Sequence, residues 1–514
     1  MTADSTPSLT YVPGRAERNG WILGLTMPQA VICLVAVLPL IVLFGANRGA
    51  QAVILLPFAA VVVALTVVPI RGRPAARWLA DTVLFATGAV TGWSSWQSRV
   101  AAGLPVDPDE PDLPGALSRL DLIDGPPMPD HGRVCVLHDT AEGRWGATAR
   151  LSARGVGLAS ALECRNLAAG LGGMLKGLSA SDRIDRASLV VRSVPDDGTA
   201  YDLWRERHQT RDAPPLALAV GDDLRRMAGS VSVRQEAFLT VSARDEVLRR
   251  AANAAGGGAF GRAHALHRAL AALVEPLQQM GCDPPDWLTG AGMAEAIRTG
   301  FNPAAAGLLT HQRLEHATGN AAGNAAGDGW AGLPAAAAGP TRAPAPAARS
   351  YHHDGFVTVS YAVIPPRAGV RFGSLAPLLA VRSPGERRSL AVHYEVLGAR
   401  MAHRIATRER QTTTLVSEIK TSKGFGAAAK DTQDRGSSYR QEDAVAAGEA
   451  MVRYAVVVSV TVPDDWNVED HAEALETSAA GQYTLVRLEL AQDSGFVAAN
   501  LPVGFGLTRM RNAL

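Results

Sequence analysis

Two long apolar runs stand out in the pattern of hydrophobic and polar positions. Residues 28–46 and 51–70 hold no charged side chain, and only four residues, 47–50, separate them. As a helix rising about 1.5 Å per residue, each run is long enough to cross a hydrocarbon layer of about 30 Å. The short connection makes the two helices antiparallel. We therefore predict a membrane hairpin, with two buried core helices or a cleaved secretory signal as the weaker alternatives.

The charges that flank the two runs give the orientation. Both outer flanks are basic and the turn holds one arginine: Arg15 and Arg18 precede the first run, Arg71, Arg73 and Arg77 follow the second, and Arg48 lies between them. By the positive-inside rule, both termini are predicted to be cytoplasmic. The expected location is the inner (plasma) membrane of a bacterium, crossed more than once.

A third segment, residues 77–100, has an apolar face at helical spacing that includes Leu79, Val83 and Val90. It also carries three tryptophans, a residue enriched at membrane–water boundaries. The segment fits a helix on the inner membrane surface as well as a helix packed on a soluble domain. Residues 1–100 are thus predicted to be a membrane hairpin followed by an amphipathic helix.

The rest of the chain predicts a mixed fold. Residues 101–131 are rich in Pro and Asp and are predicted to be an extended linker. Residues 132–315 form a first predicted subdomain. Its expected elements are two strands around the turn at 140–143, helices at 158–178, 200–208, 261–280 and 292–299, and strands at 186–194 and from 232 on.

Residues 316–350 are dominated by Ala, Gly, Pro and Asn and are predicted to be a low-complexity linker. Residues 351–514 form the second predicted subdomain. Its expected elements are strands at 356–363, within 383–397, at 455–462 and at 483–491, and helices at 398–422, 441–454 and 465–480. The similar order before and after the linker indicates two related subdomains. The fold class is α+β, with sheets covered by helices on one face.

Composition limits the functions that fit. The 514 residues have a formal net charge of +1, so no basic footprint for direct nucleic-acid binding is expected. The four cysteines, Cys33, Cys135, Cys164 and Cys282, are too far apart in sequence for a C-x-x-C pair. They are predicted to be small buried hydrophobic residues in a reducing compartment. The excess of Ala, Gly, Arg and Val over Lys indicates a high-GC bacterial genome.

One segment, residues 421–433, approaches a phosphate-binding loop. It places Lys430 six residues after Gly424, but Ala429 stands where the last glycine belongs and Asp431 where a Ser or Thr belongs. The preceding residues are charged and helix-like rather than a buried strand. We therefore predict a break between two helices and no bound nucleotide or other cofactor.

Other candidate residues also favour structural roles. His352 and His353 are adjacent on a predicted strand and point to opposite faces, and His311, His316 and His393 lack a metal-binding spacing, so no metal is expected. The acidic pairs at 196–197 and 464–465 are predicted to be turns or helix caps. Two basic clusters are predicted to be solvated surfaces, with a protein contact as the alternative: Arg382, Arg387 and Arg388, and Arg404, Arg408 and Arg410. No catalytic residue is assigned.

The order of the segments carries a resemblance. The first 100 residues resemble small membrane proteins of the PrgI type. The rest resembles the amino-terminal domain of the conjugation (type IV) secretion ATPases of the CagE/TrbE/VirB class. The segments that carry it are GRVCVLHD, SLVVRSVPDDG, VRQEAFLTVSA, AIRTGFNP, HHDGFVTVSYAVIPPR, the helical stretch 399–454 and the final DDWNVEDHAEALE…YTLVRLELAQDSGFVAANLPVG.

The chain departs from that family in one respect, because no phosphate-binding motor follows the domain. The resemblance thus implies a non-catalytic inner-membrane scaffold, of an arrangement found in actinobacteria, that docks a separate P-loop secretion ATPase and works in a hetero-oligomer with other membrane subunits. Two alternatives stay open: a component like EccE of type VII secretion, which also has two spans near its start, and a membrane-anchored enzyme.

Overall fold

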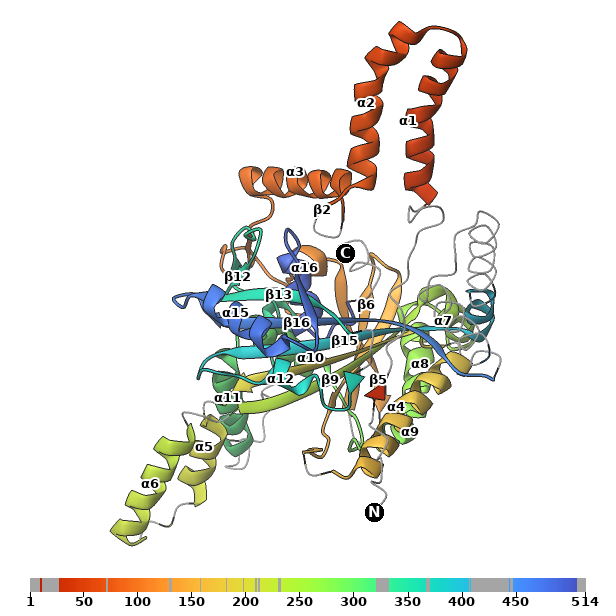
Figure 1. Cartoon of the computed structure of the whole chain (residues 1–514). Helices are drawn as coiled ribbons and strands as arrows, with labels where there is room; N and C mark the ends of the chain where they lie inside the picture. The colour runs from red at the N-terminus through yellow and green to blue at the C-terminus, as the bar shows by residue number, and fades with distance from the viewer. Residues whose placement is uncertain are drawn as a thin grey trace, which may run out of the picture.

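A computed structural model shows the fold (Figure 1). It describes residues 10–11, 27–70, 73–128, 132–157, 159–181, 183–196, 198–208, 210, 213–229, 233–319, 332–366, 370–405, 407, 443 and 447–505.

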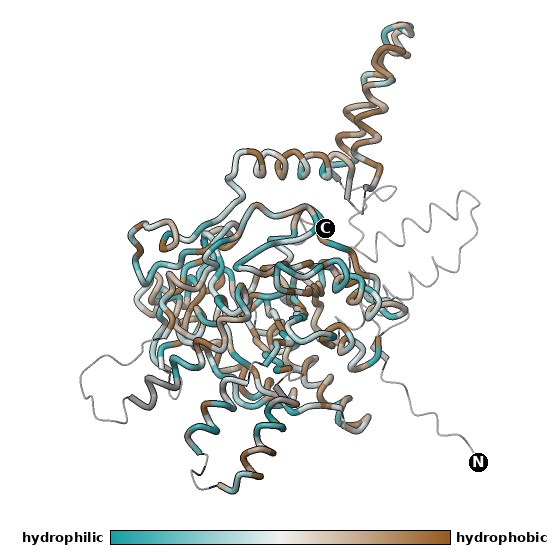
Figure 2. The backbone as a smooth tube through the Cα atoms, turned by 90° about the vertical axis from the view of Figure 1, so that its left-hand side faces the viewer, coloured by the Kyte–Doolittle hydropathy of each residue, from teal (hydrophilic) through white to brown (hydrophobic). Residues whose placement is uncertain are grey.

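A helical hairpin projects from one end of the molecule. Helices α1 (Met27–Gly45) and α2 (Gly49–Val67) lie side by side, and a short turn joins them. Helix α3 (Ala75–Thr91) follows and runs crosswise at the base of the hairpin in both views (Figures 1 and 2). The helices predicted at 28–46 and 51–70 are therefore present, and the helix predicted at 77–100 ends at Thr91.

A large antiparallel sheet forms the centre of the folded domain, and every strand pairing in it is antiparallel. Across the sheet the strands run in the order β12 (Tyr351–His353), β13 (Phe356–Ile364), β16 (Met451–Pro463), β15 (Arg387–Leu397), β8 (Arg186–Pro195), β9 (Val233–Arg244), β7 (Arg144–Leu151), β6 (Gly132–Asp139) and β5 (Leu120–Met128). Two short strands complete it: β10 (Asp286–Trp287) pairs with β7, and β17 (Thr484–Arg487) pairs with β13.

The pairing order repeats within the sheet. From the centre outward, one half runs β8, β9, β7, β6 and the other runs β15, β16, β13, β12, and both follow the same chain order. The extra strands β10 and β17 pair with the corresponding members, β7 and β13. The halves meet where β8 pairs antiparallel with β15. The central strands also read alike, Arg-Ala-Ser-Leu-Val-Val from residue 186 and Arg-Arg-Ser-Leu-Ala-Val from residue 387.

Helices cover both faces of the sheet, so the predicted one-sided arrangement is wrong. The more apolar face packs against α4 (Ala161–Ser181), α8 (Gly258–Leu270), α9 (Val274–Gln279), α12 (Ala376–Leu379) and α15 (Val468–Ala479). The other face packs against α10 (Gly290–Phe301) and α16 (Gln492–Asn500). Strand alternation explains the division, because Leu390 and Val392 of β15 point to the first face and Ser389 and His393 to the second.

Several predicted elements differ in the structure. The predicted linker at 101–131 contains β5, which is paired along its length with β6. The linker predicted at 316–350 includes buried Ala338 and Ala343. Residues 451–454, predicted to be helical, extend β16 instead, because they pair with β15. Most of the predicted helix at 398–422 lies outside the described residues. Helices α6 (Pro215–Gly229), α7 (Asp245–Ala254), α11 (Ala305–Gly319) and α16 were not predicted.

A second helical hairpin, which we call the arm, inserts between β8 and β9. It consists of α5 (Thr199–His208) and α6, and it contacts the body of the domain through α11. Ion pairs Arg205–Asp222 (2.7 Å) and Arg225–Asp202 hold its two helices together. The arm projects from the end of the domain opposite the apolar hairpin (Figure 1).

Candidate functional site

The apolar hairpin is the most exposed hydrophobic feature of the described chain. Large side chains on both helices are about half exposed or more, among them Val35 and Phe44 on α1 and Ile54 and Phe58 on α2. One described helix, α2, is long and apolar enough to cross a membrane, and most of it lies outside any protein core. The apolar part of α1, Gln29–Gly45, is shorter by the same measure. Exposure of this extent marks a surface that meets lipid or another protein.

Two buried arginines meet the carboxyl end of α10. The guanidinium of Arg192 donates to the Ala296 carbonyl (2.9 Å), and that of Arg387 donates to the Thr299 carbonyl (2.9 Å). The Thr299 carbonyl lies in the last turn and has no N–H four residues on, because residue 303 is proline, so Arg387 supplies its donor. Both cations also lie near the partial negative charge of this end of the helix. Arg192 also lies over the Phe238 ring, 4.9 Å from its centroid, and 3.8 Å from the Glu236 carboxylate.

Burial makes these charges costly. Desolvation lowers the pKa of Arg192 to about 10 and that of Arg387 to about 9, and the charge of Arg192 adds to the effect at Arg387. Glu236 opposes both shifts. A buried guanidinium offers several N–H donors in a fixed geometry. The donors of Arg192 and Arg387 that have described partners point to carbonyls of α10, to threonine hydroxyls or to a carboxylate.

A chain of hydrogen bonds connects Arg387 to His353. Arg387 donates to the Thr461 hydroxyl (3.3 Å), the Thr461 and Thr358 hydroxyls are 2.8 Å apart, and Thr358 is 2.8 Å from Nε2 of His353. Nδ1 of His353 lies 2.5 Å from the Phe301 carbonyl and must donate to it. Arginine can only donate, so Thr461 accepts from Arg387 and donates to Thr358, and Thr358 donates to Nε2 of the neutral imidazole. The chain therefore begins and ends at the last turn of α10.

This direction of donation disfavours the charged form of His353. A proton added at Nε2 would face the hydroxyl that Nε2 now accepts from, so the Thr358 and Thr461 hydroxyls would both have to reorient. Burial and the nearby Arg387 charge accordingly hold the pKa of His353 well below its usual value. A histidine of this kind is structural at neutral pH and poorly suited to proton transfer.

The opposite face of the sheet has its own buried ion pair. The Arg388 and Glu386 side chains are fully buried and lie 2.5 Å apart. The second oxygen of Glu386 is 3.1 Å from Nδ1 of His471 on α15, and Arg388 also donates to the Ser478 hydroxyl (3.2 Å). These contacts attach α15 to the start of β15, so the pair serves the packing of a helix.

The prediction that the arginine clusters are solvated is partly wrong. Arg382 and Arg404 are exposed as predicted, whereas Arg387 and Arg388 are buried. Arg408 and Arg410 lie outside the described residues, as do Gly424, Ala429, Lys430 and Asp431 of the loop-like segment. The buried pair was missed because a run of charges inside an otherwise β-like sequence was taken for surface. The alternation of Ser, Thr and Arg along β15 and β16 is the signal that could have revealed it.

The histidines behave largely as predicted. His353 is hydrogen-bonded structure, His352 lies on the other side of β12, and His393 is buried between a serine and a helix carbonyl. His311 lies on α11, and the side chain of His316 is outside the described set. Within the described ranges, no three His, Cys, Asp or Glu side chains converge as a metal site would require.

The predictions for the acidic pairs and the cysteines are confirmed in part, because Cys33 and Cys282 are only partly buried and Asp197 lies outside the described residues. The Asp196 carboxylate accepts from the Gly198 backbone (3.1 Å) in the turn before α5. Asp464 and Asp465 lie in the turn before α15, whose cap is Asn467 instead. Cys135 and Cys164 are buried and all four cysteines are free, and desolvation raises the pKa of Cys135 to about 12. Such a thiol is unreactive near neutral pH.

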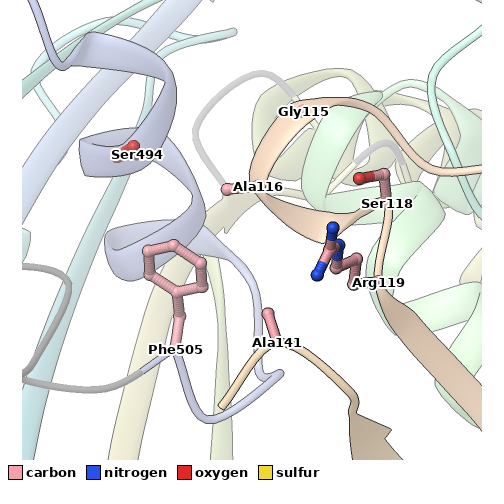
Figure 3. Close-up of a pocket in the computed structure, with 7 residues that line it drawn as sticks. All are labelled: Gly115, Ala116, Ser118, Arg119, Ala141, Ser494 and Phe505. Atoms are coloured by element: carbon pink, nitrogen blue, oxygen red, sulfur yellow. The ribbon is translucent and has the colours of Figure 1, made fainter.

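One open hollow of about 320 Å³ lies between α16 and the segment before β5 (Figure 3). Arg119 and Ser118 come from one wall, and Ser494 and Phe505 from the other. Among the described residues that line the hollow, Arg119 is the ionisable one. A nucleophile with an adjacent base, which covalent catalysis requires, does not occur among these lining residues.

The arm carries a second exposed apolar surface. Four residues of α6, Leu216, Val220, Leu224 and Met227, recur at helical spacing and are half to three-quarters exposed. Tyr201 and Trp204 of α5 are also about half exposed. This stripe was missed in the sequence, although its spacing and the flanking acidic and basic residues of 215–229 are the signs of an amphipathic helix.

No family model matches the chain, and no curated protein sequence matches it significantly.

Proposed function

We propose that this protein is a non-catalytic scaffold anchored in the bacterial inner membrane, and that it docks a separate P-loop ATPase of a conjugation-like (type IV) secretion system. The observation that carries the proposal is the pairing of two exposed apolar features at opposite ends of one folded domain. The hairpin at one end fits lipid, and the arm at the other fits a protein.

The membrane anchor is α1 and α2 together. Both helices expose apolar side chains on nearly all sides, the composition of a lipid-facing helix rather than of a core helix. The basic flanks support an orientation in which both termini and the folded domain are cytoplasmic. Cys33 on α1 and the prolines within both helices are compatible with spanning helices, in which proline is tolerated.

The interior of the domain supports a scaffold role. Several of its buried ionisable groups hold helices to the sheet: Arg192, Arg387 and His353 at α10, and Arg388 and Glu386 at α15. Burial holds the pKa of His353 well below its usual value, and the pKa values of Arg192 and Arg387, lowered to about 10 and 9, still leave both guanidinium groups charged near pH 7. We therefore assign the function of the protein to its exposed surfaces, the hairpin and the arm.

The arm is the docking surface for the motor. It lies as far from the hairpin as the fold allows, where a large cytoplasmic ATPase has room (Figure 1). Its apolar stripe on α6 is flanked by charged residues, the composition of a protein interface with an apolar centre and a polar rim. Two ion pairs fix the arm before any partner binds, which lowers the entropic cost of docking.

The test is recovery of partners from native membranes. The tagged full-length protein should retain a P-loop ATPase with a RecA-like motor domain together with other secretion subunits. The variant Leu216→Glu/Leu224→Glu should lose the ATPase and keep the membrane fraction. Phe260→Glu, at a similarly exposed position on α8, is the matched control and should retain it.

Other outcomes decide between classes. Recovery of a four-domain FtsK-like ATPase would assign the protein to type VII secretion instead. Turnover of a lipid or sugar donor would show an enzyme. Micromolar ATP binding by the purified protein, measured by calorimetry and lost in Lys430→Ala, would overturn the scaffold proposal directly.

A further inference from the structure

We infer that α3 is an in-plane helix seated in the lipid–water interface, and that it fixes the orientation of the folded domain at the membrane surface. The inference rests on the proposed spanning hairpin and adds a second lipid contact to it.

The direction of α3 matches an interfacial helix. Residues 68–74 connect α2 to α3 at the base of the hairpin. Both views show α3 lying across the axis of the hairpin rather than continuing it (Figures 1 and 2). If α2 is normal to the bilayer, α3 runs parallel to its surface at the depth where the chain leaves the hydrocarbon.

The exposed face of α3 has the chemistry of a lipid contact. Val83 and Leu84 are more than half exposed and Val90 is 87% exposed. The two polar residues of this face, Thr87 and Thr91, donate their hydroxyls to carbonyls of the helix itself (2.9 and 2.7 Å). Within α3, described throughout, the ionisable residues are Arg77, in the first turn, and Asp81, on the half-buried side. A helix with an apolar outer face and its charges at the edge lies in the interface plane.

The turn after α3 packs a tryptophan against the helix. The Trp93 side chain folds back on the helix, and a Cβ at Gly88 would lie 2.7 Å from Nε1 of Trp93. Glycine is therefore needed at position 88 for this close approach. Trp93 is 70% exposed, and because Gly88 lies on the side of α3 away from Val83 and Val90, the indole borders the apolar face and does not extend it.

The segment after Trp93 is fixed to the folded domain. Strand β4 (Trp96–Gln97) pairs with β11 (Arg342–Ala343), and the Ser98 backbone donates to the Thr341 carbonyl (3.0 Å). The Arg99 backbone donates to the buried Asp112 carboxylate (2.6 Å). Because these bonds follow α3 within a few residues, the tilt of α3 in the interface determines the tilt of the domain, and hence the direction of the arm.

Lipid is the partner that this face fits. The hairpin next to it has the same apolar character, and the ionisable groups of α3 lie in its first turn, at Arg77, and on its half-buried side, at Asp81. A protein partner on α3, including a second copy of this chain, is the outcome that the following experiment separates from lipid.

Spin labels report depth in the full-length protein reconstituted in phosphatidylcholine–phosphatidylglycerol vesicles. Cys33 and Cys282 are first replaced by Ser, and the buried Cys135 and Cys164 are kept. Single cysteines are then placed at Val61 on α2, Val83 on α3 and Leu216 on the arm. We expect the ratio of oxygen to nickel-chelate accessibility to be highest for the label at Val61 and lowest for the label at Leu216. The ratio at Val83 should lie between them and be several-fold higher than at Leu216.

The possible failures are distinct. A label at Val83 as water-exposed as that at Leu216, with Val61 still deep, overturns the inference and leaves the hairpin standing. A Val83 label shielded from both reagents means that protein covers α3 and also overturns it. A water-exposed label at Val61 rejects the proposed anchor itself.

The orienting role has a separate readout. Energy transfer from a dye at Leu216 to acceptors at the lipid surface should give one narrow distance distribution. Val83→Asp/Val90→Asp should broaden it, whereas the apolar control Val83→Leu/Val90→Leu should not. Equal distributions in all three proteins would show that α3 does not orient the domain.

Discussion

Ser188 and His393 lie opposite each other where β8 pairs with β15, and the Ser188 hydroxyl is 2.9 Å from Nδ1 of His393. Nε2 of His393 is 3.0 Å from the Ala498 carbonyl and must donate to it, so Nδ1 accepts from the hydroxyl. One neutral imidazole thus connects the two halves of the sheet and attaches α16 to both.

This arrangement predicts a loss of stability in acid. Burial, the dominant cause, together with the charge of Arg186 lowers the pKa of His393 from 6.5 to about 4. A base whose folded pKa is depressed takes up protons preferentially when unfolded. Its contribution to the free energy of unfolding is therefore complete above pH 6.5 and lost as the pH falls toward 4, on the order of 3 kcal/mol. Denaturant unfolding of the detergent-solubilised protein, followed by fluorescence at several pH values, measures it.

His393→Gln is the informative variant, because glutamine keeps one donor and one acceptor without a titrating group. We expect a flatter dependence of unfolding free energy on pH between 6.5 and 4, with the remaining slope coming in part from His353. The same slope in variant and wild type would contradict the assignment.

The hydrogen-bond chain from Arg387 to His353 makes a second prediction. Thr358→Val keeps the volume but leaves Nε2 of His353 without its donor and the Thr461 hydroxyl without its acceptor. An unsatisfied buried polar group costs about 1–3 kcal/mol, so the melting temperature should fall by several degrees. The melting temperature of Thr358→Ser, which keeps the hydroxyl, should fall clearly less. Equal losses in the two variants would mean that packing, not the chain, matters at this position.

Two glycines of α4 predict opposite effects of alanine. A Cβ at Gly170 would lie 2.6 Å from the Gln279 carbonyl oxygen, which is backbone of α9 and cannot move aside, whereas a Cβ at Gly173 would meet open space. Gly170→Ala should therefore destabilise by about 2 kcal/mol, as overpacking does. Gly173→Ala should stabilise by about 0.5–1 kcal/mol, because alanine restricts the unfolded chain and favours helix. Chemical denaturation of the two variants side by side would show whether the signs differ.

The local elements were largely predictable from the sequence because they follow local rules. The alternation in 186–194 and 356–363 and the turn at 140–143 fixed strands that the structure contains. The helix predicted at 158–178 is present despite its glycines, but it begins at Ala161, where Ser160 and Glu163 form a reciprocal cap.

What failed depends on contacts between distant residues. Met451 to Tyr454 look helical alone and become strand because β15 offers partners for all of them. Arg387 looks like surface, and only its neighbours Thr299 and Thr461, 88 and 74 residues away, make burial acceptable. The continuation of one sheet through β8 and β15 has no local signature either, since strand order is set by long-range pairing.

The last prediction concerns the turn of the hairpin. Ala46 is exposed between α1 and α2, and Ala141 is exposed on the turn between β6 and β7 of the folded domain. If both helices span the membrane with the basic flanks inside, a cysteine at position 46 faces outward and one at position 141 faces the cytoplasm. A membrane-impermeant maleimide added to intact cells should label Ala46→Cys and leave Ala141→Cys unlabelled until the membrane is permeabilised. Labelling of neither before permeabilisation would place the hairpin on the cytoplasmic side, and the scaffold would then hold to the membrane without crossing it.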